Sequence, residues 1–253
     1  KYRIDTLVLA MPSISPDKKR SVIDEGIALG LNVLSVPSPD SWMNGTFSVN
    51  QLRSLVIDDL LGRDVVVLKG DEVNSMLTDQ VVLVTGASGS IGQEIVRQML
   101  KSDVKMVISF DQAETSVFDF QFEMEKDNAD ALSSGKMKII VGDVRDEVRM
   151  RYVFKKYHPT VVFHAAAYKH VPLMEDNPYE AVRVNVFGTK VVVDLAVEFG
   201  VRKFVMISTD KAVNPTNVMG ATKRIAEMYV QSLSGVRTSF ITTRFGNVLG
   251  SNG

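Results

Sequence analysis

One short stretch of the chain gathers polar side chains directly after an apolar segment. The segment Lys203–Ser208 has the β-prone composition of a strand, and the string I-S-T-D-K continues from it through Thr209, Asp210 and Lys211. Carboxyl and amine side chains are groups that enzymes use to transfer protons. Because parallel α/β sheets bind ligands beyond the carboxyl ends of their strands, this stretch is the first candidate for a reaction site.

A second group of candidates lies on the helix predicted to follow, Val218–Leu233. Met219 and Lys223 are four residues apart in V-M-G-A-T-K, so they share one helix face. A lysine there can reach the ribose hydroxyls of a nicotinamide cofactor, and its charge favours loss of a proton from a nearby hydroxyl. The alternative for Lys223 is a solvated surface lysine. For Met219 the alternative is ordinary core packing, which is locally the better interpretation.

A glycine-rich turn links the predicted strand Val81–Thr85 to the predicted helix Ile91–Leu100. Strand, glycine turn and helix form the context in which phosphate-binding loops occur, although an ordinary corner between a strand and a helix is the alternative. The glycines would allow a tight turn, the approach of a pyrophosphate and close helix packing. The N–H groups and the dipole at the helix start attract phosphate. The loop residues expected to bind a cofactor are Gly86, Ser88, Gly89, Ser90, Ile91 and Gly92.

Asp111 follows the next predicted strand, Lys105–Phe110, about twenty residues beyond the glycine turn. A carboxylate at this position accepts hydrogen bonds from ribose hydroxyls and repels a 2′-phosphate. No Arg or Lys follows it until Lys126, so we expect NAD rather than NADP. The alternative is that Asp111 caps the helix predicted at Thr115–Glu125.

The ends of the third and fourth predicted strands add further candidates. After Met137–Val141, Asp143 could accept a hydrogen bond from an adenine amino group, with a turn or cap aspartate as an equal alternative. After Thr160–His164, three alanines would let a ribose and a nicotinamide lie against the backbone, whereas His164 is better explained as a hydrogen-bonded core residue. We expect cofactor contacts from Asp143, Val144, Ala165, Ala166, Ala167 and Ser208, and substrate contacts from Lys169 and His170.

These residues depend on an alternation of strands and helices that begins at Val81. The predicted strands are short and apolar on both faces, as a buried parallel sheet requires. The predicted fold class is therefore α/β, with a doubly wound parallel sheet of the Rossmann type. The remaining elements expected in this part are the strand Thr238–Thr243 and the helices Asp146–Lys156 and Pro178–Phe199.

The N-terminal part of the chain has the pattern of a partial α/β segment without a glycine loop of its own. Strands are expected at Asp5–Met11 and Asn32–Val36, with a helix at Arg20–Leu29 between them and a short helix within Gln51–Leu61. We therefore divide the chain into a partial nucleotide-binding-like segment at residues 1–62, a linker at residues 63–80 and an NAD-binding domain at residues 81–253.

The composition argues against several classes of protein. Of the 253 residues, 45% are hydrophobic and 23% are charged, an ordinary globular balance, and the net charge of −1 gives no case for nucleic-acid binding. No apolar run is long enough to cross a bilayer. With no cysteine and three histidines that lack ligand spacing, we expect neither a disulfide nor a metal site. Because residue 1 is a lysine and Gly253 lies in a glycine-rich turn, continuation at either end is expected.

Several strings of the sequence together resemble the extended short-chain dehydrogenase/reductases. They are T-G-A-S-G-S-I-G, D-V-R-D, H-A-A-A, S-T-D-K, the lysine of Y-x-x-x-K and R-F-G-N-V-L-G. The longer string S-T-D-K-A-V-N-P-T-N-V-M-G-A-T-K is similar to the CapD-like polysaccharide-biosynthesis branch, whose members are nucleotide-sugar 4,6-dehydratases. The resemblance covers residues 61–253 and implies that most of the C-terminal substrate-binding part is missing.

The resemblance implies roles for individual residues at the fifth strand end. It makes Asp210 the acid and Lys211 the base for water elimination. Thr209 would hydrogen-bond the 4-oxygen of the sugar, and Asn247 would meet the sugar or its diphosphate.

The same comparison with the family puts Lys223 in the position of the usual lysine and Met219 in the position of the usual tyrosine. Methionine has no ionisable proton and cannot act as the base of the first oxidation. The large dehydratases share this departure, so it supports the branch, and the base for the first step stays open.

The function that the resemblance implies is that of an NAD-dependent hydro-lyase. It would convert UDP-N-acetylglucosamine to a UDP-4-keto-6-deoxy sugar for a surface polysaccharide such as a capsule, regenerating its NAD. The alternatives are a nucleotide-sugar 4-epimerase or dehydrogenase, and a non-catalytic NAD-binding module. We expect a homo-oligomer, and a soluble chain whose parent protein lies at the cytoplasmic face of the bacterial inner membrane through segments absent here. The exact sugar and the stereochemistry at C5 stay open.

Overall fold

The computed structural model describes most of the C-terminal part of the chain and pieces of the N-terminal part. The described residues are 4–11, 18, 21–23, 25–26, 29–36, 53–54, 70–233, 235–246 and 248. The chain divides into two compact units, Lys1–Leu68 and Lys69–Gly253, and each is described by itself.

The first unit contains a small three-stranded sheet. Strands β1 (Thr6–Leu9) and β2 (Asn32–Ser35) are parallel, and β3 (Arg53–Ser54) pairs antiparallel with β2. Ile23 is buried in a small apolar cluster with residues of β1 and β2. The unit thus has strand pairing and a core of its own.

Three of the elements predicted for this unit are confirmed, and the range of the fourth is described only in part. Strands lie within Asp5–Met11 and Asn32–Val36, and the described residues of the helix predicted at Arg20–Leu29 are helical apart from Leu29, where a turn has begun. Within Gln51–Leu61, where a short helix was predicted, Arg53–Ser54 form strand β3 and pair with the edge of β2. The other residues of that range lie outside the described residues.

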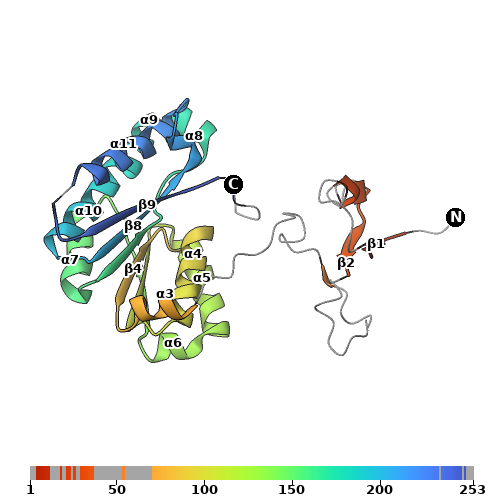
Figure 1. Ribbon diagram of the computed structural model, residues 1–253, viewed down its shortest axis with the longest axis horizontal. Helices are drawn as coiled ribbons and strands as arrows, with labels where there is room; N and C mark the ends of the chain where they lie inside the picture. The colour runs from red at the N-terminus through yellow and green to blue at the C-terminus, as the bar shows by residue number, and fades with distance from the viewer. Residues whose placement is uncertain are drawn as a thin grey trace. The chain divides into compact units, whose positions relative to one another are not determined.

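The second unit is organised around a six-stranded parallel sheet with the order β6-β5-β4-β7-β8-β9 (Figure 1). The strands are β4 (Val81–Thr85), β5 (Met106–Asp111), β6 (Met137–Val141), β7 (Val161–His164), β8 (Lys203–Thr209) and β9 (Ser239–Phe245). Every neighbouring pair is parallel. The order reverses between β4 and β7, which is where doubly wound sheets bind ligands. The predicted doubly wound α/β fold is therefore confirmed.

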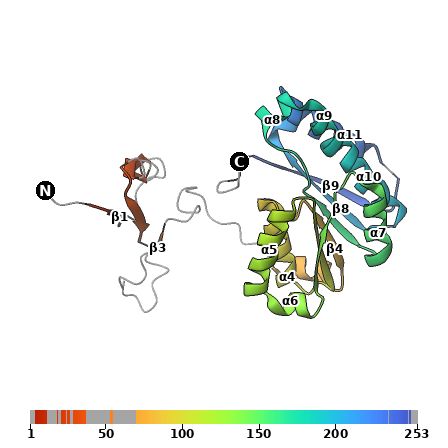
Figure 2. The same ribbon diagram turned by 180° about the vertical axis from the view of Figure 1, so that it is seen from behind.

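Helices cover both faces of this sheet, as Figures 1 and 2 show. One face carries α3 (Gly70–Leu77), α4 (Ser90–Lys101), α5 (Glu114–Asp127) and α6 (Ala129–Ser133). The other face carries α7 (Glu147–Tyr157), α10 (Thr189–Glu198) and α11 (Val218–Ser232). The short elements α8 (Val171–Asp176) and α9 (Pro178–Ala181) pack on α11. None of the described helices is both long and apolar enough to cross a bilayer.

Side chains of the central strands alternate between two apolar cores. In β4, Val82 and Val84 are buried in the core that includes α4 and α5. Leu83, between them, is buried in the opposite core with residues of α7, α10 and α11. Because both faces are covered, consecutive residues of the strand are all apolar, which is the pattern that predicted a buried parallel sheet.

Two features of the second unit differ from the sequence-based expectation. The helix predicted at Pro178–Phe199 changes type, since α9 widens into a π-helical segment, η4 (Val182–Gly188), before α10 begins. Hydrophobic spacing carries no signature of a π segment. Helix α3 lies within residues 63–80, which were predicted as linker, and Leu77 at its end is buried in the core beside α4.

Candidate functional site

The glycine turn after β4 is packed tightly against the segment that follows β7. Gly86 has a φ of +70°, and a Cβ there would lie 2.4 Å from the backbone nitrogen of Ala166. A Cβ on Gly92 would lie 2.1 Å from the carbonyl oxygen of Gly86. Both positions therefore require glycine for internal reasons, and they fix the turn at the switch point of the sheet.

Gly89 is different, because the protein itself leaves room for a side chain there. The nearest atom to a Cβ on Gly89 is the carbonyl oxygen of Gly86, at an ordinary contact distance of 3.4 Å. Its φ of −76° and ψ of 161° are open to any residue. Gly89 precedes Ser90, the first residue of α4, and no side chain caps this helix start. Open space beside an uncapped helix N-terminus fits a phosphate group of a ligand.

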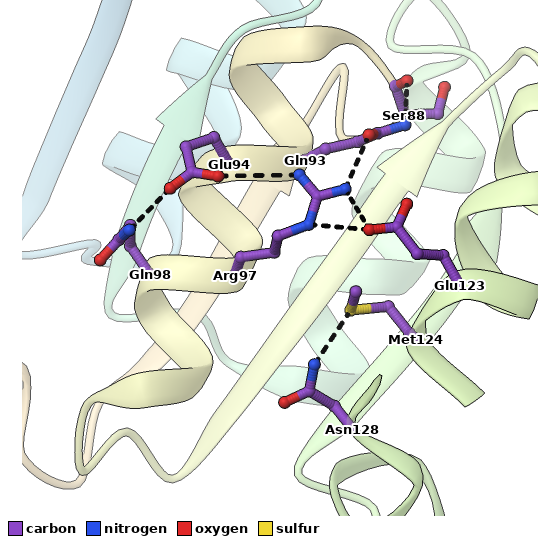
Figure 3. Close-up of polar contacts among 8 residues, drawn as sticks. All are labelled: Ser88, Gln93, Glu94, Arg97, Gln98, Glu123, Met124 and Asn128. Atoms are coloured by element: carbon purple, nitrogen blue, oxygen red, sulfur yellow. Dashed lines mark hydrogen bonds and ion pairs between the residues drawn. The ribbon is translucent and has the colours of Figure 1, made fainter. Parts of the chain in front are cut away.

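Two side chains hold the glycine turn in place. The backbone N–H of Ser88 donates to Asp111 Oδ2 at 3.0 Å, and Gln93 Nε2 donates to the carbonyl oxygen of Ser88 at 2.9 Å. Figure 3 shows how Arg97 holds Gln93 in turn: it donates to Gln93 Oε1 at 3.1 Å and forms an ion pair of 2.6 Å with Glu123 on α5. The role of Gln93 in holding the turn was not predicted from the sequence. The only sequence feature that points to it is its position one turn into the helix.

Asp111 lies at the end of β5, where the sequence predicted it. Its second oxygen, Oδ1, accepts from the N–H of Ala113 at 3.0 Å. The alternative of a helix N-cap is wrong, because α5 begins at Glu114, its N-cap is Ala113, and no side chain caps it. The carboxylate instead ties the glycine turn to the end of β5. Its contact with a ribose stays a prediction.

Asp143 is held by an arginine close by in sequence. Arg145 donates to Asp143 Oδ2 from Nε at 2.8 Å, and its other side pairs with Glu180 on α9 at 2.8 Å. Burial alone would raise the pKa of Asp143, but the hydrogen bonds and the charge of Arg145 outweigh it and lower that pKa. Asp143 is thus a carboxylate fixed in a turn, and Val144 beside it is buried. Contact of either residue with adenine stays a prediction.

The segment after β7 contains the three alanines and a buried histidine. The N–H of Ala165 donates to the carbonyl oxygen of Thr85, so the segment runs beside the glycine turn. His164 is fully buried and lies 2.8 Å from the hydroxyl of Thr85 and 2.9 Å from that of Thr189. Because Thr189 donates its own proton to the carbonyl oxygen of Asn185, His164 Nε2 is the donor to Thr189 and Nδ1 the acceptor from Thr85.

Burial, together with the charge of Lys223, lowers the pKa of His164 to about 3. The ring is therefore neutral at physiological pH, and the prediction that His164 is a hydrogen-bonded core residue is confirmed.

The polar cluster that ends β8 is assembled as predicted. Thr209 donates to Asp210 Oδ1 at 3.0 Å, and Lys211 Nζ forms an ion pair of 3.3 Å with the same oxygen. The N–H of Lys211 donates to the hydroxyl of Thr209 at 3.3 Å, which turns the chain into the 3-10 helix η5 (Asp210–Ala212). The bonds from Thr209 and Lys211 lower the pKa of Asp210. The side chains of Asp210 and Lys211 are both partly exposed to solvent, so they are accessible to a substrate.

Lys223 lies beneath this cluster. It is 4% exposed, so the surface-lysine alternative is wrong, and its Nζ donates to the carbonyl oxygen of Ile207 at 2.7 Å. Burial lowers the pKa of Lys223 to about 8, and the negative charge of Glu227 acts in the opposite direction. Met219, one turn earlier, is buried with Met174 and Ala181. The core-packing interpretation of Met219 is therefore confirmed.

Several buried polar residues behind the cluster were not predicted. Asn185, in the π segment, clamps both the N–H and the carbonyl oxygen of Tyr168 and also donates to Thr222 at 3.0 Å. Glu227 is fully buried and is held by Arg244 of β9. Glu227 did carry a signal, because it continues the four-residue spacing of Met219 and Lys223 and so places a charge on the buried helix face.

Of the three residues predicted to contact the substrate, the structure describes two. Lys169 and His170 are exposed after β7, on the same edge of the sheet as the polar cluster. Asn247 lies outside the described residues. Among the described residues, no group of three His, Cys, Asp or Glu side chains is placed to hold a metal ion.

The assembled edge fits a dinucleotide. In the described part of the chain, Ser208 Oγ is the one buried side-chain polar atom without a hydrogen-bond partner, and it lies at the end of β8. Within the same residues Lys223 Nζ has Ile207 as its only hydrogen-bond acceptor, although an ammonium has three donors. These unused groups suit ribose hydroxyls, and the space beside Gly89 suits a phosphate.

Comparison with known proteins gives a consistent result. The family described as polysaccharide biosynthesis protein matches residues 82–253. The capsular polysaccharide biosynthesis protein CapD of Staphylococcus aureus is 44% identical over 100% of this chain and 42% of its own length. A UDP-N-acetylglucosamine 4,6-dehydratase (inverting) of Campylobacter jejuni is 36% identical over 70% of this chain and 52% of its own length. A UDP-glucose 4-epimerase of Rickettsia canadensis is 37% identical over the same shares. The chain spans about half the length of these relatives.

Proposed function

Because the chain belongs to the polysaccharide biosynthesis protein family, we propose that it is the cofactor-binding and catalytic part of an NAD-dependent nucleotide-sugar 4,6-dehydratase. The proposed substrate is UDP-N-acetylglucosamine and the proposed product its 4-keto-6-deoxy derivative, made for a surface polysaccharide. The observation that carries the proposal is the ion pair of Asp210 and Lys211, which follows β8 and is partly exposed to solvent, close in sequence to Ile207, whose carbonyl oxygen accepts from the buried Lys223.

The proposed cofactor site follows the carboxyl edge of the sheet. The glycine turn would hold the pyrophosphate, Asp111 the adenosine ribose, and Lys223 with Ser208 the nicotinamide ribose. The NAD held there would supply the hydride chemistry, as acceptor of the hydride of C4 and as its donor to C6. The carboxylate of Asp111 and the absence of a following basic residue up to Lys126 support NAD over NADP.

The proposed elimination uses Asp210 and Lys211 as a pair. Once C4 is a ketone, the C5 proton is acidic, and Lys211 as a neutral amine removes it. The electron pair left by that proton expels the C6 hydroxyl, which takes a proton from Asp210 and leaves as water. Return of the hydride to C6 then needs a proton at C5, which the Lys211 ammonium supplies. Thr209 would hydrogen-bond the 4-oxygen of the sugar.

The ion pair already contains the proton that this step needs. In this structure the pKa of Asp210 is lowered, so the side chain is a carboxylate and has no proton to donate. Transfer of one proton from the Lys211 ammonium to Asp210 Oδ1 gives a neutral amine and a carboxylic acid without changing the net charge. A bound sugar that excludes water favours this neutral pair over the ion pair, because separated charges lose solvation in a dry site.

Identity alone does not choose between a dehydratase and an epimerase, since relatives of both kinds match almost equally. Three residues favour the dehydratase. An epimerase or a simple dehydrogenase does not need the acid–base pair of Asp210 and Lys211, and it normally uses a tyrosine where this chain has Met219. The same pair argues against a non-catalytic NAD-binding module.

The test is incubation of the intact protein with UDP-N-acetylglucosamine and NAD, followed by mass spectrometry and NMR of the nucleotide sugar. The proposal expects a product lighter by one water, with a ketone at C4 and a methyl group at C6. A sugar of unchanged mass with an inverted C4 would identify an epimerase. An unchanged substrate would favour the binding module.

A further inference from the structure

We propose that Glu227 is a positioning residue of the cofactor site: its buried negative charge lies four residues after Lys223 on the same face of α11 and stabilises the ammonium of Lys223. The inference rests on the proposed function, because Lys223 matters here as the group that meets the cofactor ribose. Glu227 itself would contact neither cofactor nor substrate.

The geometry around Glu227 is that of a fully buried and fully paired carboxylate. Glu227 is 0% exposed. Its Oε1 accepts from Arg244 Nε at 2.9 Å, and its Oε2 accepts from Arg244 Nη2 at 2.7 Å and from Arg224 Nη1 at 3.3 Å. Burying a carboxylate is costly, and a buried ion pair often contributes little net stability compared with apolar side chains. Because burying the carboxylate of Glu227 costs free energy, its presence needs an explanation other than stability.

The position of Glu227 supplies that explanation. It follows Lys223 by four residues in α11, so the two side chains share one face of the helix. Lys223 is almost completely buried, and burial works against its ammonium form. Glu227 is the negative charge that acts in favour of the ammonium.

The other groups around Lys223 cannot replace Glu227. On β7, His164 is neutral and lies close enough for the charge of Lys223 to act on it. On β9 and α11, Arg244 and Arg224 are cations and disfavour a second positive charge. On η5, Asp210 and Lys211 are paired with each other.

Ser208 gives independent support. Its hydroxyl faces the carboxylate of Glu227 but makes no hydrogen bond of normal geometry within the described residues. Glu227 therefore lies close to both of the buried groups assigned to the proposed ribose site, Lys223 on its own helix and Ser208 on β8. The ion pair with Arg244 anchors that arrangement to β9, the outermost strand of the sheet.

The inference predicts how the affinity for NAD depends on pH. The affinity requires the ammonium of Lys223, so it is lost as the pH rises through the pKa of that group, which is about 8. Without the negative charge of Glu227 the same loss begins at lower pH. The loss of one charged hydrogen bond corresponds to a decrease in affinity of about tenfold at pH 8.

The experiment uses the intact protein and three variants, with NAD titrated from about pH 6.5 to about pH 9. Glu227→Gln removes the charge, but it leaves the partly exposed Arg244 beside a weaker partner and could destabilise the fold. The double variant Glu227→Met/Arg244→Met replaces both partners with apolar side chains, which preserves stability. Glu198→Gln, an exposed glutamate paired with Arg151, is the control. In parallel, NMR of lysine labelled with ¹³C at Cε follows the titration of Lys223 directly.

The expected result is that Glu227→Gln moves the alkaline loss of NAD affinity, and the Lys223 titration, to lower pH. The double variant, which also loses the cation of Arg244, should move both less, and Glu198→Gln should change neither. The inference is overturned if the folded Glu227→Gln variant titrates like the unmodified protein, because Glu227 then has only a structural role. If the unmodified protein binds no NAD, the proposed function fails, and the Lys223 titration still decides whether Glu227 acts on that ammonium.

Discussion

Lys223 Nζ donates a hydrogen bond of 2.7 Å to the carbonyl oxygen of Ile207. Ile207 lies three residues before Asp210, so this contact joins the start of α11 to the strand end that carries the candidate acid and base. The same ammonium keeps two further donors for a ligand. One buried lysine thus connects the proposed cofactor site with the proposed elimination site.

Two glycines of the phosphate-binding turn should respond differently to the same substitution. Gly92→Ala places a Cβ 2.1 Å from the carbonyl oxygen of Gly86, and we expect the overpacking to destabilise the fold by about 1–3 kcal/mol. Gly89→Ala meets nothing closer than 3.4 Å, and we expect a change in stability within about 1 kcal/mol. Its affinity for NAD should nevertheless fall at least about tenfold, because the new methyl group lies where the phosphate approaches.

Urea unfolding and NAD titration of both variants would check this pair. For Gly89→Ala, the urea unfolding curve shows whether the variant is folded, so that a loss of NAD affinity can be attributed to the binding site. If a folded Gly89→Ala protein bound NAD as tightly as the unmodified protein, the prediction that this turn binds the phosphate would be wrong.

Asp111 should control the choice between NAD and NADP. The unmodified protein is expected to bind NAD more tightly, because the carboxylate repels a 2′-phosphate. Asp111→Ala removes the acceptor for the N–H groups of Ser88 and Ala113, so NAD affinity should fall and the preference over NADP should narrow. Isothermal titration with both cofactors measures the ratio. Tighter binding of NADP by the unmodified protein would contradict the assignment.

His164 should make the stability of the second unit depend on pH. Its pKa is about 3 in the folded protein and near 6.5 in the unfolded chain, so between these values the unfolded state binds the extra proton. Stability should therefore rise with pH across this window, by up to about 1.4 kcal/mol for each pH unit. His164→Gln can still accept from Thr85 and donate to Thr189, but it cannot titrate. Urea midpoints at several pH values should show a shallower dependence in this variant, and an unchanged slope would mean that the ring is protonated in the folded state.

Asp210 and Lys211 should be needed for elimination but not for oxidation at C4. Asp210→Asn keeps the size and removes the acid, and Lys211→Met removes the base, with an expected loss of ~10²–10⁴-fold in product formation for each. With substrate present, both variants of the intact protein should still reduce bound NAD, and the absorbance of NADH should persist. Lys223→Met is the contrasting variant, because it should form little NADH at all. If Lys211→Met never reduces NAD, Lys211 acts in the first step, where Met219 cannot.

Local patterns in the sequence predicted the parts of the site that depend on local structure. The glycines, Asp111 and the polar cluster each lie at a strand end, and the strands could be recognised because they are apolar on both faces. The strand order then brings these ends to one edge of the sheet. Lys223 was found because it shares a helix face with Met219.

The parts that could not be predicted depend on contacts between distant residues or on a rare backbone geometry. The spacing from Lys223 places Glu227 on the buried helix face, but its pairing cannot be predicted until Arg244, seventeen positions later, is known to be on the neighbouring strand. Asn185 is one polar residue between valines, and its clamp on Tyr168 requires the π segment around it. The role of Asp111 in holding the turn requires the position of Ser88, which the spacing of residues does not provide.

The most direct test of the central claim follows one hydrogen atom through the reaction. The intact protein is incubated with NAD and UDP-N-acetylglucosamine that carries deuterium at C4, and the nucleotide sugar is then examined by NMR. A 4,6-dehydratase moves the hydride within one sugar, so the account predicts that the deuterium is found on the C6 methyl group of a 4-keto product. Deuterium retained at C4 of an inverted sugar, or released on free NADH, would contradict it.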